Sequence, residues 1–305
     1  RLSELWSIFD FLMPGLLGTR ESFAKRFESP VEHAEGDSAA RMQALVSPFV
    51  LRRVKEDVVA DLPEKIEDTV MAQLTGEQRK LYLANQDRIA QQVQHREAGE
   101  FKKDKLKVLA ELTKLRQICC DPRLHYEDYK AGSAKLDTCM ELVHGALDGG
   151  HRILLFSQFT GMLDIIGKRL AKEDIAFLKL TGASSKESRA KMVAQFQAGE
   201  VPVFLISLKA GGVGLNLTAA DVVIHYDPWW NVAAQDQATD RAHRIGQQHT
   251  VTVYKLIAKD TIEERIMQMQ ESKRDLVNSV LGGDGISSAL FTREDVLALL
   301  GGDGR

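Results

Sequence analysis

The chain has 305 residues, of which 44% are hydrophobic and 27% are charged, and its net charge is -3. These proportions are those of a globular protein with a sizeable core, in two domains or in one enlarged α/β domain. The weak negative charge gives no global attraction to nucleic acid, so any contact with DNA must come from local groups. The three cysteines match neither a disulfide framework nor a zinc site, and we predict buried, reduced thiols and no metal ligands.

The chain starts at Arg1, without an initiator methionine, in the apolar segment RLSELWSIFDFLMPGLLG, which suggests a piece of a longer polypeptide. No signal peptide and no apolar run of membrane-spanning length is present, so we expect no membrane partner. The first apolar helix should stop at Pro14 and Gly15. Long charged helices are predicted from Gly76 to about His95 and from Glu100 to Cys119.

The second of these predicted helices carries two patterns. Leucines recur on one side and predict a packing face; they are Leu106, Leu109, Leu112 and Leu115. Lysines crowd its start, at the positive end of the helix dipole, which hints at an anionic partner, although a solvated face explains them equally well. These lysines are Lys102, Lys103, Lys105 and Lys107.

From about Ser133, short apolar runs alternate with helix-length segments. The runs are RILLF, AFLKL, VFLIS, VVIHY and TVTVYKLI, and the segments between them lie near 161–172, 186–197 and 233–243. Near-continuous apolar strands that alternate with helices predict a parallel sheet covered on both faces. Ligands of such sheets bind at the carboxyl ends of the strands, so the residues that follow each run are the candidate site.

Small and hydroxyl residues follow four of the runs. Ser157-Gln158 follows the first, Thr181-Gly182 the second, LKAGGVGLNLT the third and DPWWN the fourth. Each alone is ordinarily a helix cap or a flexible turn. A glycine-rich turn that opens a helix can also hold an anion, because bare N–H groups and the helix dipole favour negative charge. Four such ends on one sheet edge favour a continuous phosphate-binding track.

The segment DRAHRIGQ, residues 240–247, places Arg241 and Arg244 three positions apart. On a helix this spacing puts both guanidinium groups on one face. Taken alone, such a pair is ordinarily part of a solvated helix face. His243 between them is interpreted as a packing residue, or as a residue that supports the arginines from behind, rather than as a general base.

The segments FSQFTGMLDII, LTGASS, ISLKAGGVGLNLTAADVVIHYDPWWN and QATDRAHRIGQ occur in this order. They resemble motifs IV to VI of the SWI/SNF-type chromatin-remodelling and DNA-translocase ATPases of helicase superfamily two. Further segments resemble other parts of that family: ELWSIFDFLMPGLLG the segment after motif III, FVLRRVKEDVVADLPEK the inter-lobe signature and LRQICCDP the second helical protrusion. TIEERIMQMQESKRDLVNSVL resembles its brace helix. The compact protrusions are similar to those of a bacterial member.

The resemblance implies the second RecA-like helicase lobe, an α/β fold in which helices flank a parallel sheet, with an N-terminal helical protrusion region and a C-terminal brace helix. The implied segments are 1–60, which packs on a first lobe; 61–132, linker and protrusion; 133–260, the RecA-like lobe; and 261–305, brace and tail. The sequence holds neither a Gly-x-x-x-x-Gly-Lys-Ser/Thr loop nor an Asp-Glu strand end. We therefore expect negligible ATP hydrolysis by this chain alone, and ATP and Mg²⁺ as cofactors of the parent that this chain does not bind tightly.

The resemblance also implies roles for single residues. Arg244 is the first candidate for an arginine finger on the γ-phosphate, and Arg241 would contact phosphate or couple the cleft to DNA. The implied nucleotide-binding set is Gln237, Asp240, Arg241, Arg244, Gly214 and Asn216. The implied contacts to the DNA backbone, which read no sequence, are Ser157, Gln158, Thr181, Gly182, Ser207, Lys209, Gly212 and Trp230.

The parent would thus be an ATP-dependent translocase on double-stranded DNA, in the cytoplasm or nucleoid of a bacterium or the nucleus of a eukaryote. Its further partners would be the first RecA-like lobe and, through apolar surface in residues 1–60, a second copy of the chain. Two alternatives stay open: a DNA- or partner-binding module without catalysis, and the lobe of an RNA or single-strand helicase. Ala242-His243 and Gly246-Gln247 argue against the latter.

Overall fold

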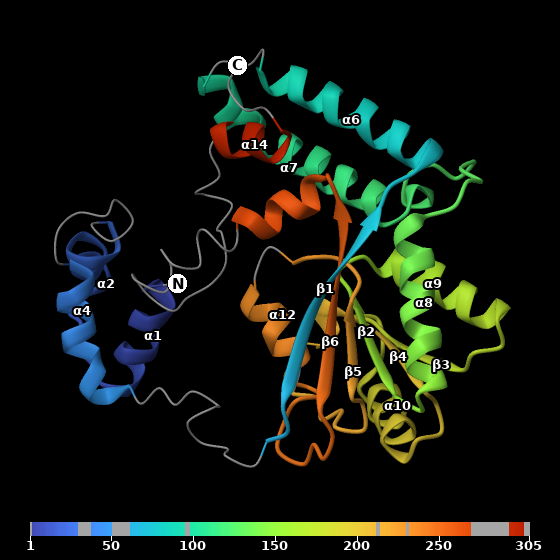
Figure 1. Ribbon diagram of the computed structural model, residues 1–305. Coiled ribbons are helices and arrows are strands. Elements are labelled where there is room, and N and C mark those ends of the chain that lie inside the picture. Colours follow the sequence, from blue (N-terminus) through green and yellow to red (C-terminus); the bar gives the residue numbers. More distant parts are fainter. Residues whose placement is uncertain are drawn as a thin grey trace. The chain divides into compact units, whose positions relative to one another are not determined.

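The computed structural model describes residues 2–29, 38–50, 62–94, 98–211, 214–229, 232–269 and 293–301 (Figure 1). The chain divides into two compact units. Of the described residues, those up to 50 belong to a smaller unit and those from 62 onward to a larger one. Each unit is described by itself.

The smaller unit is helical. It consists of α1 (Leu2–Leu12), α2 (Arg20–Phe23), a π-helical segment (Ala24–Glu28), α4 (Ser38–Val46) and a 3-10 turn (Ser47–Phe49). Helix α1 ends just before Pro14 and Gly15, as predicted, and Gly15 adopts a φ of 88°, a conformation that favours glycine. The helices enclose a small core of Phe9, Leu17, Phe23, Phe27, Met42 and Val46.

The larger unit is built on a six-stranded sheet of order β1-β6-β5-β2-β4-β3, in which all neighbouring strands are parallel. The strands are β1 (Lys65–Gln73), β2 (Ile153–Ser157), β3 (Phe177–Leu180), β4 (Val203–Ser207), β5 (Val222–His225) and β6 (Val251–Lys259). Five of them coincide with the five apolar runs, so the predicted parallel α/β sheet is confirmed. Because β5, β2 and β4 are neighbours, their carboxyl ends lie side by side at one edge (Figure 1).

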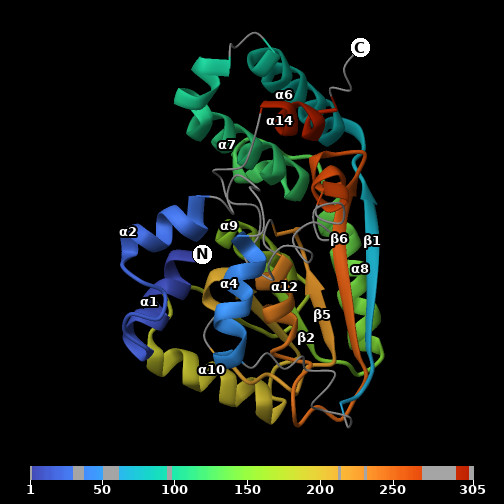
Figure 2. The same ribbon diagram turned by 90° about the vertical axis from the view of Figure 1, so that its left-hand side faces the viewer.

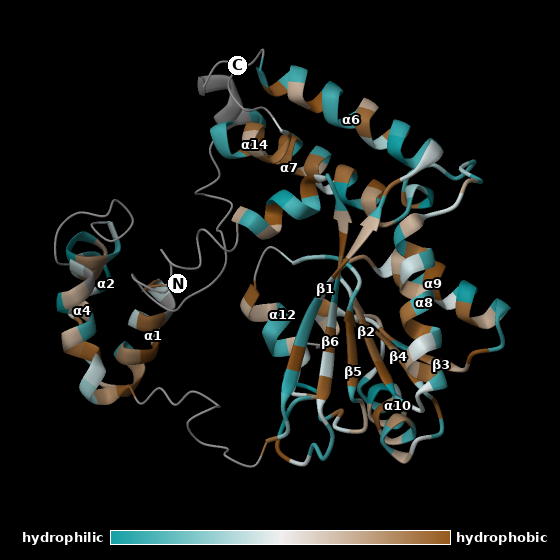
Figure 3. Ribbon diagram, in the orientation of Figure 1, coloured by the Kyte–Doolittle hydropathy of each residue, from teal (hydrophilic) through white to brown (hydrophobic). Residues whose placement is uncertain are grey.

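Strand β1 was not predicted. It comes from the stretch 61–132, in which we expected only linker and helices, and it pairs with β6 from Lys65 opposite Val251 to Gln73 opposite Lys259. It is an edge strand with mostly exposed side chains, of which only Ala72 is buried. Its sequence therefore lacks the continuous apolar character of the central strands, as Figure 3 shows.

Alternate residues of each strand point to opposite faces, and each face is covered by its own helices. Ile153 and Leu155 of β2 join a core with α8 (Ala134–Asp148) and α9 (Thr160–Lys172). Leu154 and Phe156 join a second core, with α10 (Lys186–Ala198) and α12 (Val232–Thr239). Figure 2 shows α8 and α12 on opposite sides of the sheet.

A third core joins α6 (Gly76–Gln94), α7 (Ala98–Cys120), α14 (Arg293–Leu299) and the helix at 262–269. The predicted leucine packing face of α7 is partly wrong. Leu112 and Leu115 are buried, but Leu106 is 81% exposed and Val108 is buried instead. No helix among the described residues is long and apolar enough to cross a membrane.

The helix at 262–269 begins the predicted brace, whose continuation at 270–292 lies outside the described residues. A buried ion pair anchors it: Lys135 Nζ lies 2.5 Å from Glu263 Oε2, and both side chains are 0% exposed. The same carboxylate oxygen accepts a hydrogen bond from the backbone N–H of Ala258 at 2.9 Å. The start of the helix at 262–269 is therefore fixed to α8 and β6.

The three cysteines, Cys119, Cys120 and Cys139, are buried and unpaired, as predicted. Burial raises the pKa of all three thiols, to about 12 for Cys139. They are therefore protonated and unreactive at neutral pH, which fits a structural role.

Candidate functional site

A buried polar cluster joins the carboxyl ends of β2 and β5. Ser157 is fully buried, and its hydroxyl donates a hydrogen bond to Asp227 Oδ1 at 2.5 Å. The backbone N–H of Gln158 lies 3.3 Å from both oxygens of the same carboxylate. Burial raises the pKa of Asp227, and the nearby positive charge of Arg116 opposes this rise. Asp227 thus fixes the backbone immediately after β2.

Arg116 of α7 reaches into this cluster and is only 2% exposed. Its Nη1 donates to Gln158 Oε1 at 3.2 Å, its Nη2 donates to the carbonyl of Pro228, and its guanidinium lies 5.8 Å from the Phe159 ring centroid. Helix α7 therefore sets the orientation of the Gln158 side chain. We call Arg116, Ser157, Gln158 and Asp227 the strand-end cluster.

Ser157 and Gln158, both predicted DNA contacts, differ in whether their side-chain donors are used within the protein. The Ser157 hydroxyl donates to Asp227 inside the protein, so it supports the backbone that precedes Gln158, and its contact with the DNA backbone stays a prediction. Gln158 Nε2, by contrast, has no hydrogen-bond partner among the described residues. Unsatisfied donors of this kind mark positions where a ligand or water completes the hydrogen bonding.

The other predicted DNA contacts follow β3 and β4. After β3, the Thr181 hydroxyl accepts from the N–H of Ala183 at 3.4 Å, which leaves Gly182 at an exposed turn. After β4, Ser207 is 3% exposed and its hydroxyl lacks a partner among the described residues. Lys209 lies in the short helix α11 (Leu208–Gly211). Gly212 and Trp230 lie outside the described residues.

Helix α12 ends at Thr239, so Arg241 and Arg244 lie in turns beyond it, and the helix predicted to His243 is wrong at its end. Beyond the helix, the two arginine carbonyls accept hydrogen bonds from one residue remote in sequence and from one in a local turn. The Arg241 carbonyl accepts from the N–H of Leu217 at 3.0 Å, and the Arg244 carbonyl accepts from the N–H of Gln247 at 2.9 Å. We call residues 240–247 the arginine segment.

The two arginines differ in environment. Arg241 is 8% exposed, and its Nε has no hydrogen-bond partner among the described residues. Burial lowers the pKa of its guanidinium, and the charge of Arg244 lowers it further, although an arginine stays protonated at neutral pH. Arg244 is exposed. A buried cation with an unused hydrogen-bond donor, next to an exposed cation, is suited to binding an anionic ligand.

The remaining predicted nucleotide-binding residues come from two stretches of the chain. Gln237 and Asp240 are exposed at the end of α12, and Gly214 and Asn216 are exposed in the segment after α11. The hydrogen bond from Leu217 to the Arg241 carbonyl joins these two stretches. His243 does not face them as a base: its Nε2 pairs with the Pro63 carbonyl at 2.7 Å, a packing contact.

Sequence reasoning missed Arg116 and Asp227. Asp227 stands in the quoted DPWWN segment directly after the β5 run, and a carboxylate at a parallel strand end is a signal that could have identified it. Arg116 has a weaker signal, because an arginine on a helix is ordinarily exposed and only the fold reveals its burial.

Profiles of two protein families match the chain: the SNF2-related domain over residues 1–124 and the helicase conserved C-terminal domain over residues 134–246. Together with the parallel sheet and its strand-end residues, they define the chain as carrying the C-terminal lobe of a helicase-type protein. The SWI2/SNF2 ATPase C-terminal domain from Sulfolobus solfataricus matches with a TM-score of 0.64 and 32% identity, covering 77% of this chain and 98% of that domain. The chain belongs to the SWI2/SNF2 family, and its sheet is the predicted RecA-like lobe.

Longer relatives agree. The chain is 40% identical, over 98% of its length, to an uncharacterized ATP-dependent helicase of Mycoplasma pneumoniae. It is 40% identical, over 96% of its length, to the putative ATP-dependent helicase/translocase YwqA of Bacillus subtilis. The Sulfolobus solfataricus SWI2/SNF2 ATPase core in complex with dsDNA matches 98% of this chain and 64% of that chain, with a TM-score of 0.66 and 36% identity. The chain spans only 28% and 32% of the two curated relatives.

Proposed function

We propose that this chain is the C-terminal part of an ATP-dependent translocase on double-stranded DNA, in which it supplies arginines to an ATP site shared with a first RecA-like lobe. The observation that carries the proposal is the pair of arginines in the arginine segment. Arg241 is a buried cation whose Nε is unused, and Arg244 beside it is exposed. Phosphate oxygens would satisfy both the charge and the open hydrogen-bonding position.

ATP with Mg²⁺ supplies the phosphoryl group that is transferred, and we propose that this chain's arginines stabilise the charge that develops on it. Arg244 is exposed and is therefore the proposed finger on the γ-phosphate, whereas the buried Arg241 would hold phosphate or couple the cleft to DNA. The planar guanidinium suits two phosphate oxygens at once, so lysine would be a poor replacement. Gln237, Asp240, Gly214 and Asn216 are the proposed further nucleotide contacts.

The carboxyl ends of β2, β4 and β3 are the proposed DNA track. Three observations support it: these strands are neighbours in the sheet, Gln158 Nε2 and Ser207 Oγ lack partners among the described residues, and Gly182 is exposed. Contacts of this kind bind the backbone without reading sequence. Lys209, Gly212 and Trp230 are further proposed DNA contacts, chosen from the sequence alone. The related SWI2/SNF2 ATPase core from Sulfolobus solfataricus was solved in complex with dsDNA.

Residues 1–60 are proposed to pack on the first lobe. Their described helices carry apolar side chains that the smaller unit itself does not cover, with Phe11 85%, Leu12 66% and Ile8 55% exposed. Exposed apolar side chains at this density mark an interface. The first lobe is the proposed occupant, and pairing with a second copy of the chain is the alternative. We likewise propose 61–132 as linker and protrusion and 261–305 as brace and tail.

The test joins this chain to the first RecA-like lobe of a family member and measures ATP turnover with double- and single-stranded DNA. We expect turnover that rises with double-stranded DNA and falls steeply in Arg244→Ala, and negligible turnover by the chain alone. Stimulation by single-stranded DNA or RNA alone would favour the helicase alternative. DNA binding without turnover in the joined protein would favour the binding-module alternative.

A further inference from the structure

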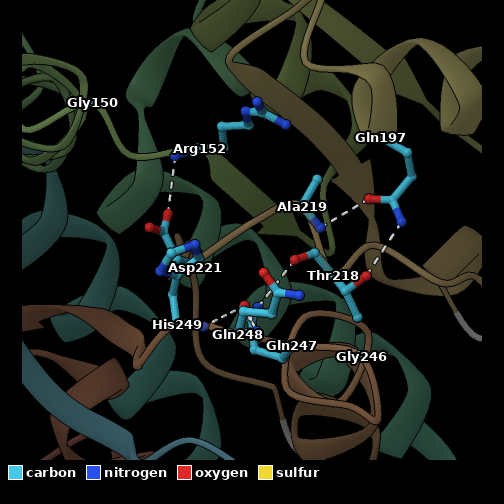
Figure 4. Close-up of a pocket in the computed structure, with 10 residues that line it drawn as sticks. All are labelled: Gly150, Arg152, Gln197, Thr218, Ala219, Asp221, Gly246, Gln247, Gln248 and His249. Atoms are coloured by element: carbon cyan, nitrogen blue, oxygen red, sulfur yellow. Dashed lines mark hydrogen bonds between the residues drawn. The ribbon is translucent and has the colours of Figure 1, made fainter.

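One neutral side chain, that of Gln247, holds the arginine segment. Gln247 is 6% exposed, and its amide contacts five backbone groups. Its Nε2 donates to the carbonyl oxygens of Ala220 at 2.7 Å, Ala242 at 3.1 Å and Thr218 at 3.2 Å. Its Oε1 accepts from the N–H groups of Gln248 at 2.8 Å and His249 at 3.0 Å (Figure 4).

These bonds tie two stretches of the proposed nucleotide site together. Ala242 lies between the two arginines, and its carbonyl is held by Gln247. Thr218 and Ala220 belong to the turn that follows Gly214 and Asn216, and their carbonyls are held by the same amide group. Gln247 therefore fixes the arginine segment against the stretch 214–220.

The same turn is held from its other side by a second glutamine, Gln197 of α10. Its Nε2 donates to Thr218 Oγ1 at 3.3 Å, and its Oε1 accepts from the N–H of Ala219 at 2.8 Å (Figure 4). Both glutamines line one polar pocket. None of the hydrogen bonds found for Gln197 goes to the arginine segment, so it provides a matched control.

The amide of Gln247 has no capacity left for a ligand. A primary amide offers two N–H donors and one oxygen with two lone pairs, and all of them are engaged with backbone groups. A direct role in binding ATP is thereby disfavoured. Its chemistry suits positioning, because catalytic groups must be held within about 0.5 Å of their working geometry by hydrogen-bonded neighbours.

We propose that Gln247 is a positioning residue that sets Arg241 and Arg244 relative to the stretch 214–217 and so determines the rate of ATP hydrolysis. The inference rests on the proposed function of the two arginines. It adds that the positions of the two arginines depend on hydrogen bonds from a neutral amide to backbone groups.

The first experiment compares Gln247→Met with Gln197→Met in the protein that joins this chain to a first lobe. Both changes remove an amide from the same turn, and only the first frees the arginine segment. We expect kcat to fall about tenfold in Gln247→Met, with a smaller change in KM for ATP, and to change less than about twofold in Gln197→Met. An equal loss in both variants would show that turn stability alone matters and would overturn the proposal.

A double variant separates this inference from the proposed function. If Gln247 acts through the arginines, adding Gln247→Met to Arg244→Ala should lower kcat by less than about twofold beyond Arg244→Ala alone. Independent, multiplicative losses would overturn the positioning role. Full turnover in Arg244→Ala would instead contradict the proposed function, whatever Gln247→Met does.

Hydrogen exchange of the chain without nucleotide gives a readout apart from activity. The amide of Leu217, which donates to the Arg241 carbonyl, should exchange about tenfold faster in Gln247→Met and at an unchanged rate in Gln197→Met. Unchanged exchange in both would overturn the proposal. If Gln247→Met fails to fold, Gln247→Asn decides: it keeps the amide on a shorter side chain, and a folded Asn variant with full kcat would overturn the proposal.

Discussion

Buried charge holds Gln158 at the carboxyl end of β2, whereas a neutral amide holds the arginine segment. Arg116 contacts the Gln158 side chain and Asp227 holds its backbone, and both are almost wholly buried. On the arginine segment the cations are the proposed working groups, and the Gln247 side chain holds the backbone carbonyl of Ala242 between them. The strand-end cluster thus uses its charges internally, while the charges of the arginine segment are the ones that we propose to contact a ligand.

This difference has a physical consequence. A buried charge that loses its partner destabilises the fold strongly, whereas a charge that faces a ligand can be removed at little cost to stability. Substitutions in the strand-end cluster should therefore appear mainly as lost stability. Substitutions of the arginines should appear mainly as lost turnover.

The largest effect is expected for Arg244→Ala in the protein that joins this chain to a first lobe. Loss of a finger on the γ-phosphate should lower kcat by about 10³-fold. Because Arg244 is exposed, the melting temperature should stay within a few degrees of the original. Turnover and thermal unfolding measured on one preparation check both expectations. A large drop in melting temperature would contradict the proposed difference between the arginine segment and the strand-end cluster.

The next effect is expected for Arg116→Leu, which removes the cation near Asp227 and two hydrogen bonds of the strand-end cluster. The free energy of unfolding should fall by about 3 kcal/mol. Arg169→Leu is the matched control, since Arg169 pairs with Glu173 on the surface and its loss should cost less than about 1 kcal/mol. Denaturant unfolding of the chain measures both, and equal losses would contradict a special role for the buried arginine.

A smaller effect is expected for Gln158→Ala, because one hydrogen bond from a neutral amide to a charged phosphate contributes about 1.5 kcal/mol. Affinity for double-stranded DNA should fall about tenfold, with no change in its salt dependence. Lys209→Ala should lower that salt slope by about one. Gln248→Ala is the control, because Gln248 precedes β6 and so lies at the amino ends of the strands, opposite the proposed DNA track. An equal loss of DNA affinity in Gln158→Ala and Gln248→Ala would contradict a DNA track at the carboxyl ends of the strands.

The central fold could be predicted because burial on both faces leaves a continuous apolar run. All five residues of β2 and of β4 are buried, and both strands were found from RILLF and VFLIS. Strand β1 was missed because an edge strand keeps most of its side chains in water, so KIEDTVMAQ carries no such run. Pairing with β6, which is remote in sequence, makes it a strand.

The candidate site residues could be selected by motif, but the contacts that position them could not be predicted. Arg241, Arg244 and Gln158 could be selected from their segments, whereas the Arg241 carbonyl just beyond α12 is bonded to the N–H of Leu217. That contact joins residues remote in sequence, which local spacing does not encode. The burial of Arg116 beside Asp227 is of the same kind.

Asp227 provides the last and most specific prediction, on the pH dependence of stability. Burial raises its pKa in the folded chain above the ordinary value of 3.8, so the folded state binds the proton more tightly than the unfolded state. Within the window between 3.8 and the raised folded pKa, Asp227 therefore lowers stability as pH rises, by at most about 1.4 kcal/mol per pH unit.

Asp227→Asn should remove that contribution, so the stability difference between Asp227→Asn and the original chain should change with pH inside this window and level off above it. Arg116→Leu should extend the window to higher pH, because Arg116 opposes the rise in the pKa of Asp227. Denaturant unfolding at a series of pH values measures the differences. A window unmoved by Arg116→Leu would mean that Arg116 does not act on the Asp227 carboxylate, and the strand-end cluster would then resemble the arginine segment in its reliance on neutral contacts.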